Sequence, residues 1–320
     1  MTVAYRMPAS FSPLPAFVPA PAQAIANAYD KAGPRYGIYA DGDVRKLFAF
    51  DGRYSHGDRK TWDAIEVALR AMRAGGKETL RVLDLGCGPG TWLRRAVTRA
   101  RQLGFTHIEA LGLDIATVQL QRARIHARAL SEQEGITMRF ERGDLRGRLA
   151  VPDRGIDLCL CLNGVLNHLP PSELPSVFAE IARVTSGWFL ATVRAVGSTP
   201  TVYIDELSAA RRFHQDNRQN RLEVEFHNGS RAAFDSHLFA RRELQALAAR
   251  HFEIDDLRGL DLFHGRFASD PRWNPEGGIS SGHFNEELER LENRYCRDPG
   301  FMDHATHLLL AARAAKPGAA

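Results

Sequence analysis

RVLDLGCGPGTW, residues 81–92, is an apolar run that ends in a glycine-rich turn and leads into a helical pattern. The glycines at 86, 88 and 90 allow positive φ and let the backbone approach a ligand closely. The first turn of the following helix presents N–H groups that have no partner within the helix. The stretch therefore predicts a strand, a turn and a helix, with a ligand bound at the turn.

Strands and helices alternate on the carboxyl side of this turn. Buried strands are expected at 80–85, 107–113, 137–141, 156–162, 188–193, 252–262 and 307–312. Helices are expected at 92–103, 116–129, 172–185, 241–250 and 286–295. This alternation predicts a doubly wound α/β fold, in which a largely parallel sheet carries helices on both faces.

Two segments precede the α/β domain, which covers about 78–314. Residues 1–24 contain five prolines, which predicts a flexible lead and argues against a signal peptide. Residues 25–77 predict a helical extension that serves as a lid. Its helices are expected at 22–39 and 61–73, and residues 36–62, rich in aromatic residues, Gly and Asp, are expected to form a structured loop with short helices.

The domain also carries an insertion at 196–240, where the alternation is interrupted. A polar helical stretch is expected at 201–218. Asn228-Gly229 lies between two short apolar segments, which is a strong hairpin signal. The insertion is therefore predicted to be a helix followed by a hairpin, and a second lid.

Asp84, two residues before the first glycine, argues against a dinucleotide at the turn. Its carboxylate would repel a pyrophosphate, and the spacing is G-x-G-x-G, whereas dinucleotide sites have G-x-G-x-x-G. A cationic group, such as the ammonium of an amino acid, suits this position instead. The residues expected around such a ligand are Asp84, Gly86, Cys87, Gly88 and Gly90.

Three further polar residues follow later strands of the predicted sheet. Asp114 ends the second strand, where a carboxylate can accept hydrogen bonds from both ribose hydroxyls. Asp144 follows the third strand and is placed to accept from an adenine amine, and Asn163 follows the fourth, beside the expected reaction centre. Because open α/β sheets bind ligands at the carboxyl ends of their strands, these residues are expected to meet in one site.

The sequence resembles the class I S-adenosylmethionine-dependent methyltransferases in four motifs: VLDLGCGPG at 82–90, LDI at 113–115, GD at 143–144 and LNGVLNHLP at 162–170. The resemblance covers 78–195 well and 241–314 by the order of elements. It implies a Rossmann-like seven-stranded sheet whose last strand is antiparallel, and the run at 307–312 is the candidate for that strand.

The same resemblance implies S-adenosyl-L-methionine as the cofactor and S-adenosyl-L-homocysteine as the product. Tyr36 lies in the extension, which closes over the cofactor in related small-molecule enzymes. The implied contacts are Asp84, Gly86 and Gly88 with the methionine part, Asp114 and Ile115 with the ribose, and Asp144 and Leu145 with the adenine.

The acceptor of the methyl group is less constrained by the sequence. In-line displacement at an activated methyl needs positioning and exclusion of water, so no acid–base triad is expected. Residues 163–166, NGVL, lack the Asn/Asp-Pro-Pro-Tyr/Phe motif of nucleobase-amine methyltransferases, and no paired-glutamate loop of protein arginine methyltransferases is found. Residues 163–170 are similar to small-molecule members, including the ubiquinone-biosynthesis and glycine N-methyltransferase branches. We therefore expect a small metabolite with an N, O or S acceptor atom.

Four residues are candidates for the acceptor side. His168, with an ordinary pKa of about 6.5, could be a catalytic base or a hydrogen-bonding group, or a structural residue that caps the next segment. Arg194 follows the fifth strand and could hold a substrate carboxylate. Tyr39 in the extension and Tyr203 in the insertion could line the lids. Packing is the alternative for these last three.

The composition limits the partners and the compartment. The 42 Lys+Arg and 38 Asp+Glu residues leave a net charge of +4 over 320 residues, which is a weak footprint for nucleic acid. No run reaches the about 18 apolar residues of a membrane span. The four cysteines lack the spacing of a disulfide framework or a zinc site, so we expect a cytoplasmic protein without a metal. A monomer and a homodimer both stay open.

Three other functions stay open at this point. A protein or RNA methyltransferase would show a contiguous arginine patch beside the pocket. A catalytically silent protein of the same fold would bind the cofactor without turnover. A nicotinamide dehydrogenase is disfavoured by Asp84 and by the glycine spacing.

Overall fold

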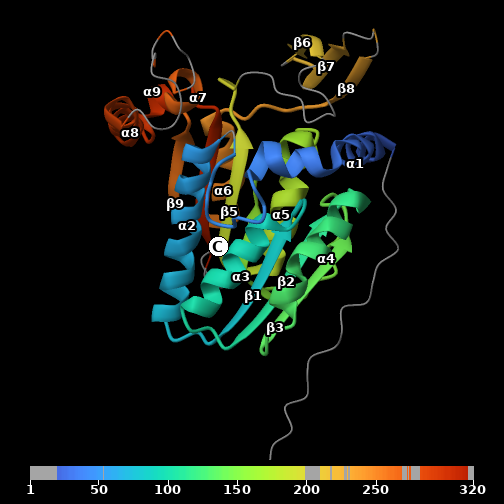
Figure 1. Cartoon of the computed structure of the whole chain (residues 1–320), viewed down its shortest axis with the longest axis vertical. Coiled ribbons are helices and arrows are strands. Elements are labelled where there is room, and N and C mark those ends of the chain that lie inside the picture. Colours follow the sequence, from blue (N-terminus) through green and yellow to red (C-terminus); the bar gives the residue numbers. More distant parts are fainter. Residues whose placement is uncertain are drawn as a thin grey trace, which may run out of the picture.

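A seven-stranded sheet with the order β3-β2-β1-β4-β5-β10-β9 forms the centre of the protein (Figure 1). The computed structural model describes residues 20–52, 54–198, 210–216, 218–226, 229, 231–268, 272, 274 and 282–315. The strands are β1 (Thr79–Leu85), β2 (His107–Asp114), β3 (Ile136–Arg142), β4 (Ile156–Cys161), β5 (Thr185–Arg194), β9 (Phe252–Leu260) and β10 (His307–Ala314). The pairs among β1 to β5 are parallel, whereas β10 is antiparallel to both neighbours. The predicted doubly wound sheet with an antiparallel last strand is confirmed.

Helices cover both faces of this sheet (Figure 1). One face carries α2 (Ser55–Ala74), α3 (Thr91–Gln102) and α4 (Thr117–Ser131), and the other carries α5 (Leu174–Val184) and α6 (Arg241–Ala249). Helix α1 (Ala20–Asp41) crosses above the carboxyl ends of the central strands. The remaining helices are the 3-10 turn η1 (Val165–His168), α7 (His264–Phe267), α8 (Gly282–Tyr295) and α9 (Pro299–Met302).

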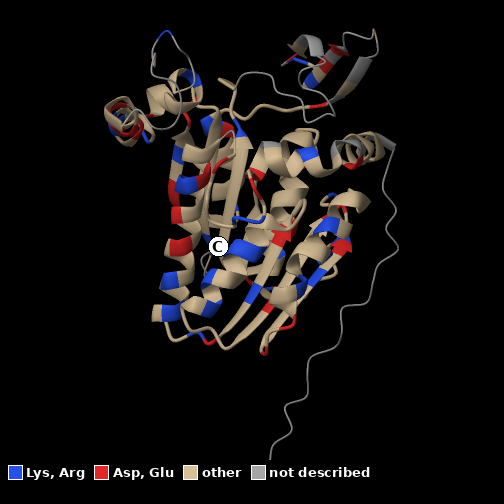
Figure 2. Ribbon diagram, in the orientation of Figure 1, with Lys and Arg blue, Asp and Glu red and all other residues tan. Residues whose placement is uncertain are grey.

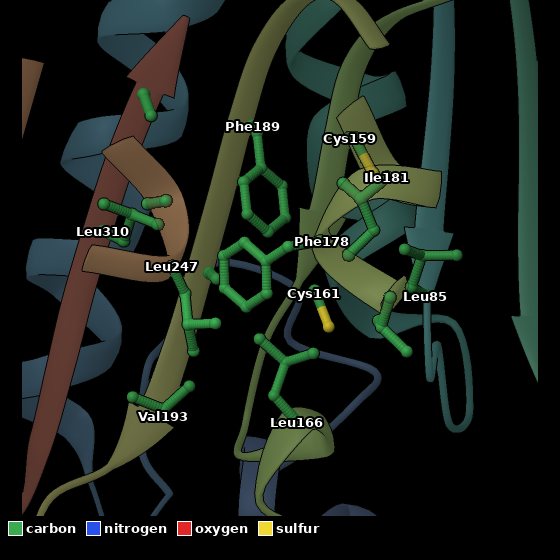
Figure 3. Close-up of a cluster of buried hydrophobic side chains, with 14 of the residues drawn as sticks. Leu85, Cys159, Cys161, Leu166, Phe178, Ile181, Phe189, Val193, Leu247 and Leu310 are labelled. Carbon is green, nitrogen blue, oxygen red and sulfur yellow. The ribbon is translucent and has the colours of Figure 1, made fainter. Parts of the chain in front are cut away.

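Alternate residues of each strand pack into two separate cores. In β1, Leu83 belongs to the cluster under α5 and α6, while Val82 belongs to the cluster under α2 and α3. Figure 3 shows the first cluster, where Phe178 of α5 meets Phe189 of β5 edge-on with the ring centroids 6.0 Å apart. Such burial stabilises the fold by about 1.5–3 kcal/mol for each large apolar side chain.

Strand β4 is buried along its whole length. Cys159 and Cys161 point to the same face, as predicted from their spacing, and Figure 3 shows both in the cluster with Phe178. All four cysteines of the chain are free and buried. They are therefore core residues of the fold.

The extension is more helical than its sequence indicated. Helix α1 is kinked at Gly33, which has φ +48 and precedes Pro34, a residue without an N–H to donate. The structured loop with short helices predicted over 36–62 is shorter than expected: α1 continues to Asp41 and α2 begins at Ser55, so the connection covers only 42–54. Position 57, inside α2, is occupied by glycine. A Cβ there would lie 2.5 Å from Asp261 Oδ2, so a larger residue would clash.

The insertion is a three-stranded antiparallel sheet, β6 (Ala210–Asp216), β7 (Arg221–Phe226) and β8 (Arg231–Asp235). The hairpin predicted at Asn228-Gly229 is confirmed by the β7–β8 pairing. The helix predicted over 201–218 is wrong for 210–216, which pairs with β7 from Asp216↔Arg221 onward. The periodicity of residues 201–218 alone does not reveal that β7 is available as a partner strand. Residues 199–209 lie outside the described part of the chain.

Charged residues of both signs are interspersed over the helices and strands in the view of Figure 2. Among the described helices, none has the length and apolar character needed to cross a membrane.

Candidate active site

A cavity lies between α1 and the carboxyl ends of β1, β2, β3 and β4. From α1 it is lined by Ala22, Ile25, Tyr29 and Tyr36. Most of the predicted cofactor residues meet here although they come from four different loops, and His168 lies with them. The predicted residues that line the cavity are Tyr36, Gly86, Gly88, Asp114, Ile115, Asp144, Leu145, Asn163 and His168.

The turn after β1 needs glycine at the cavity wall. Gly86 has φ +71, and a Cβ on it would lie 2.3 Å from the Val165 side chain. Gly88 has φ +51, and a Cβ there would lie 3.2 Å from the ring of Tyr36. Both the backbone conformation and the close approach of neighbouring side chains therefore exclude larger residues.

The N–H groups of the turn at 86–90 are all used within the chain. Leu113 O accepts two of them at 2.7 and 2.9 Å, and Asp114 Oδ2 accepts the N–H of Gly88 at 2.8 Å. The carbonyl of Cys87 accepts the fourth at 2.9 Å, and Pro89 has none. This turn therefore offers no donor of the kind that holds a phosphate group in dinucleotide sites.

Three of the predicted residues do not line the cavity. Asp84 is only 2% exposed, and its Oδ2 has no hydrogen-bond partner among the described residues. Burial raises the pKa of Asp84 well above its usual range, and the carboxylates of Asp114 and Asp41 add to the effect. Cys87 packs in the core on the α3 side, and Gly90 begins α3. Asp84 is thus a buried side chain next to the turn, with one oxygen that is not used in a hydrogen bond among the described residues.

Asp114 connects β2 to the turn. Its Oδ2 accepts from Gly88 N and its Oδ1 accepts from Ala116 N, both at 2.8 Å. Burial raises the pKa of Asp114, although these N–H groups favour the ionised form. The carboxylate is therefore held rigidly at the cavity wall, where it retains lone pairs for a ligand.

Arg146, which the sequence interpretation missed, holds Asp144. Its Nε lies 3.0 Å from Oδ1 and its Nη2 lies 2.6 Å from Oδ2. Burial acts to raise the pKa of Asp144, but the hydrogen bonds and charge of Arg146 outweigh it, so the pKa lies below its usual range. Asp144 therefore stays ionised, and part of its capacity to accept from an adenine amine is already used. The sequence did contain a signal for this ion pair, because Arg146 follows Asp144 by two residues.

His168 bridges the extension and the insertion. Its Nδ1 lies 3.2 Å from the backbone carbonyl of Asp235, and its Nε2 lies 2.8 Å from the hydroxyl of Tyr29. A carbonyl can only accept, so Nδ1 carries the proton and Nε2 accepts from the tyrosine. Burial lowers the pKa of His168 to about 4, so the ring is neutral at neutral pH.

Residues 82–187 match the family model described as methyltransferase domain. This part of the chain is a methyltransferase domain. The predicted resemblance to the class I methyltransferases is therefore confirmed for this range, which contains the glycine turn, Asp114, Asp144 and His168.

Curated relatives of the chain are also methyltransferases. The probable methyltransferase ltbC of Aspergillus luteorubrus is 37% identical over 120 residues, which are 36% of this chain and 40% of that protein. Sterol 24-C-methyltransferase ERG6B of Gibberella zeae is 29% identical over 196 residues, which are 60% of this chain and 45% of that protein. The matches thus span less than half the length of these curated relatives. Among solved structures, the PH0226 protein of Pyrococcus horikoshii OT3 is 17% identical, with a TM-score of 0.49 over 84% of this chain and 95% of that one.

Helix α1 docks on the methyltransferase domain through the start of α4. Asp30 Oδ1 accepts from Val118 N at 2.8 Å, in the first turn of α4, where a negative charge is favourable. Gln119 Nε2 donates to the carbonyls of Tyr29 and Gly33 at 3.0 and 3.1 Å. The sequence interpretation missed Tyr29, Asp30 and Gln119, because no local pattern indicates contacts about 90 residues apart.

Of the remaining predicted residues, only Asn163 lies at the cavity wall among the described side chains. Arg194 is 4% exposed, lines neither described cavity, and places its Nε 3.2 Å from Ser198 Oγ. Asn163 takes φ +58 at the cavity wall, with its N–H donating to Thr192 Oγ1 at 2.7 Å. The side chain of Tyr39 and the whole of Tyr203 lie outside the described part of the structure.

Proposed function

We propose that this protein is an S-adenosylmethionine-dependent methyltransferase that acts on a small metabolite and releases S-adenosylhomocysteine. The observation that carries the proposal is the wall of the first cavity. There the Asp114 carboxylate stands beside a glycine turn whose N–H groups are already used. The carboxylate suits a ribose, and the turn suits an adenosyl ligand that has no diphosphate.

The residues present fit this cofactor. Asp84 lies buried behind the turn, outside the cavity lining, with one oxygen that has no hydrogen-bond partner among the described residues. The cationic end of an amino acid bound beside it would favour the ionised carboxylate, against the burial that raises its pKa. Asp114 would hold the ribose, and the apolar side chains of Ile115 and Leu145 would flank the adenine. When bound, the cofactor supplies a methyl group that its sulfonium has already activated. The chain then has to position the acceptor and exclude water, and α1 covers the cavity for that purpose.

His168 is proposed to orient the acceptor. The Tyr29 hydroxyl occupies Nε2, so an acceptor hydroxyl or amine in that place would donate to the same lone pair. A pKa of about 4 makes the ring a weak proton acceptor, because each unit below neutrality lowers its proton affinity by about 1.4 kcal/mol. We therefore assign His168 to alignment of the acceptor group, and the proton leaves to solvent.

A small-molecule acceptor is supported by two observations. Sterol 24-C-methyltransferase of Gibberella zeae, which the chain matches over 196 residues, is named for a small-molecule substrate. The cavity lies under α1, which leaves little room for a polymer at the reaction centre. This relative also adds a carbon acceptor to the N, O and S acceptors considered above.

Calorimetric titration tests the cofactor. We expect S-adenosylmethionine and S-adenosylhomocysteine to bind and NADH not to bind. Asp114→Asn should raise the dissociation constant of the cofactor by about tenfold or more, which corresponds to the loss of a hydrogen bond to a charged group. Asp63→Asn, at an exposed position on α2, is the matched control and should bind like the wild type. Binding of NADH alone would contradict the proposal.

Transfer of a labelled methyl group tests the acceptor. The protein is incubated with labelled cofactor and a cell extract that has been separated into small molecules and macromolecules. Label in the small-molecule fraction is the expected result. Label in protein or RNA would favour the macromolecular alternative, and cofactor binding without any labelling would favour a catalytically silent protein.

A further inference from the structure

A second cavity, of about 970 Å³, lies beyond the carboxyl end of β9 and shares no lining residue with the first. Its wall includes His56 from the start of α2, His264 from α7 and Glu289 from α8. Figure 1 shows α7 and α8 together above β9, at the edge where α2 begins. Three elements that are far apart in the sequence thus contribute metal-ligand side chains to one place.

The three side chains bring one potential ligand atom each close to the other two. One ligand atom from each of the three lies within 4.8 Å of the other two. His56 Nδ1 is 3.3 Å from Glu289 Oε2, and the rings of His56 and His264 are stacked with centroids 4.1 Å apart. Ligands bound to one ion at about 2.0–2.2 Å lie roughly 3–4 Å from each other. An imidazole binds a metal ion in the plane of its ring, so one of the two stacked rings has to turn out of the stack to complete the set.

Two buried nitrogen atoms of this cluster make no well-directed hydrogen bond. His56 is 4% exposed, and its Nδ1 faces Glu289 Oε2 at 3.3 Å without forming a hydrogen bond to any described residue. His264 Nε2 has no hydrogen-bond partner within the part of the chain that the structure describes. Buried polar atoms are nearly always hydrogen-bonded, so these two nitrogens in one cavity wall point to a ligand that both would bind.

Neighbouring residues orient the Glu289 carboxylate toward His56. Lys60 Nζ lies 2.5 Å from Glu289 Oε1, which leaves Oε2 facing His56. Glu292 Oε1 accepts from His264 N at 3.0 Å and so holds the start of α7. Asp261, whose Oδ2 also has no hydrogen-bond partner among the described residues, lines the same cavity.

We propose that His56, His264 and Glu289 bind a divalent transition-metal ion of the Zn²⁺ type. Two imidazoles and one carboxylate suit this class of ion, whereas Mg²⁺ and Ca²⁺ require oxygen ligands. Three protein ligands leave at least one coordination position open toward the second cavity. The sequence expectation of no metal rested on the spacing of the cysteines and of His304 and His307. It did not detect this set, because its members are spread from residue 56 to residue 289.

Titration of the untagged, full-length protein with Co²⁺ tests the site, after removal of metal with a chelator. We expect one equivalent of Co²⁺ to bind with a visible d–d absorption, Zn²⁺ to displace it, and Mg²⁺ to have no effect. Wild-type protein that shows no absorption at stoichiometric, micromolar Co²⁺ would overturn the proposal. The readout does not depend on methyl transfer, so it is independent of the proposed function.

Two variants assign the ligands. Glu289→Gln and His264→Ala should each weaken Co²⁺ binding by more than about tenfold. The matched controls are Glu287→Gln and His283→Ala on helix α8, which should bind like the wild type. His283 is exposed, and Glu287 is half-buried, pairs with Arg290 and does not line the second cavity. Circular dichroism and thermal unfolding establish that each variant is folded, and Glu289→Gln preserves the shape of a side chain that is 38% exposed. Equal binding by Glu289→Gln, His264→Ala and the controls would also overturn the site.

Discussion

The hydroxyl of Tyr29 lies 2.8 Å from Nε2 of His168, and this contact joins helix α1 to the segment that follows β4. The other ring nitrogen of His168 donates to the carbonyl of Asp235, at the end of β8. One histidine therefore connects the extension, the methyltransferase domain and the insertion over the proposed active site. Because Nε2 has one lone pair, the contact with Tyr29 and the proposed contact with an acceptor compete for the same atom of His168.

Tyr29→Phe removes this hydroxyl and retains the ring that meets Tyr36 edge-on at 5.1 Å. The loss of one hydrogen bond should weaken the docking of α1 by about 1 kcal/mol. We expect hydrogen exchange of the amides in 20–41 to become severalfold faster. Tyr295→Phe, far from α1 in the sequence and on α8, is the control and should leave this exchange unchanged. Unchanged exchange in Tyr29→Phe would show that the hydroxyl does not hold α1.

Cofactor entry should require movement of α1. The first cavity encloses about 80 Å³, whereas sites for ligands of this size occupy about 300–1,000 Å³. Helix α1 forms one side of the cavity and is kinked at Gly33, so it is the element best placed to move. We expect S-adenosylhomocysteine to slow hydrogen exchange in 20–41 and to leave α6 unaffected. A complex in which α1 exchanges as in the free protein would contradict a role in closure.

The sheet and the cofactor side of the site could be predicted because their signals are local. Strand alternation, the glycines of the turn and the carboxylates at strand ends all follow from short stretches of sequence, and Asp114 and Asp144 lie where their strands indicated. Cys87 and Gly90 belong to the same motif but serve packing and the start of α3. A motif therefore identified the turn without distinguishing its ligand-facing residues from those that shape it.

The parts that escaped prediction depend on contacts between distant segments. The first turn of α2 contacts Asp261, about 200 residues away: Gly57 N donates to Asp261 Oδ1 at 3.2 Å, and a Cβ on Gly57 would lie 2.5 Å from Asp261 Oδ2. Strand β6 forms because β7 offers it an edge, which a helical pattern at 201–218 did not reveal. Tyr29 meets His168 only once α1 has docked on α4. No periodicity in one stretch contains such information.

Removal of the Arg146 guanidinium should weaken the adenine side of the site. In Arg146→Gln the Asp144 carboxylate loses the hydrogen bonds that hold it, and its pKa should rise because burial is then opposed less. We expect the dissociation constant for S-adenosylhomocysteine to rise about fivefold, corresponding to about 1 kcal/mol. Calorimetry measures the change, with the exposed Arg148→Gln as the control. If both variants bind equally well, the arginine does not prepare Asp144 for the ligand.

Acid should destabilise the protein in part through His168. Burial lowers its pKa in the folded state to about 4, while the unfolded chain keeps a value of about 6.5. The unfolded state therefore binds the proton first as the pH falls, so the contribution of His168 to stability is complete above about pH 6.5 and is lost between about pH 6.5 and pH 4. The ring is partly exposed to the cavity, where water moderates the effect, so we expect a loss of about 1–3 kcal/mol.

Urea unfolding of the wild type and of His168→Gln between pH 7 and pH 4.5 measures this contribution. Glutamine can donate to Asp235 O and accept from Tyr29 without titrating, so the free energy of unfolding of the variant should fall less steeply with acid than that of the wild type. His307, whose pKa burial lowers to about 3, titrates in an overlapping range and is present in both proteins, so it cancels in the difference. Parallel pH profiles would show that His168 is protonated as easily in the folded protein as in the unfolded chain, and that the cavity around it is open to water.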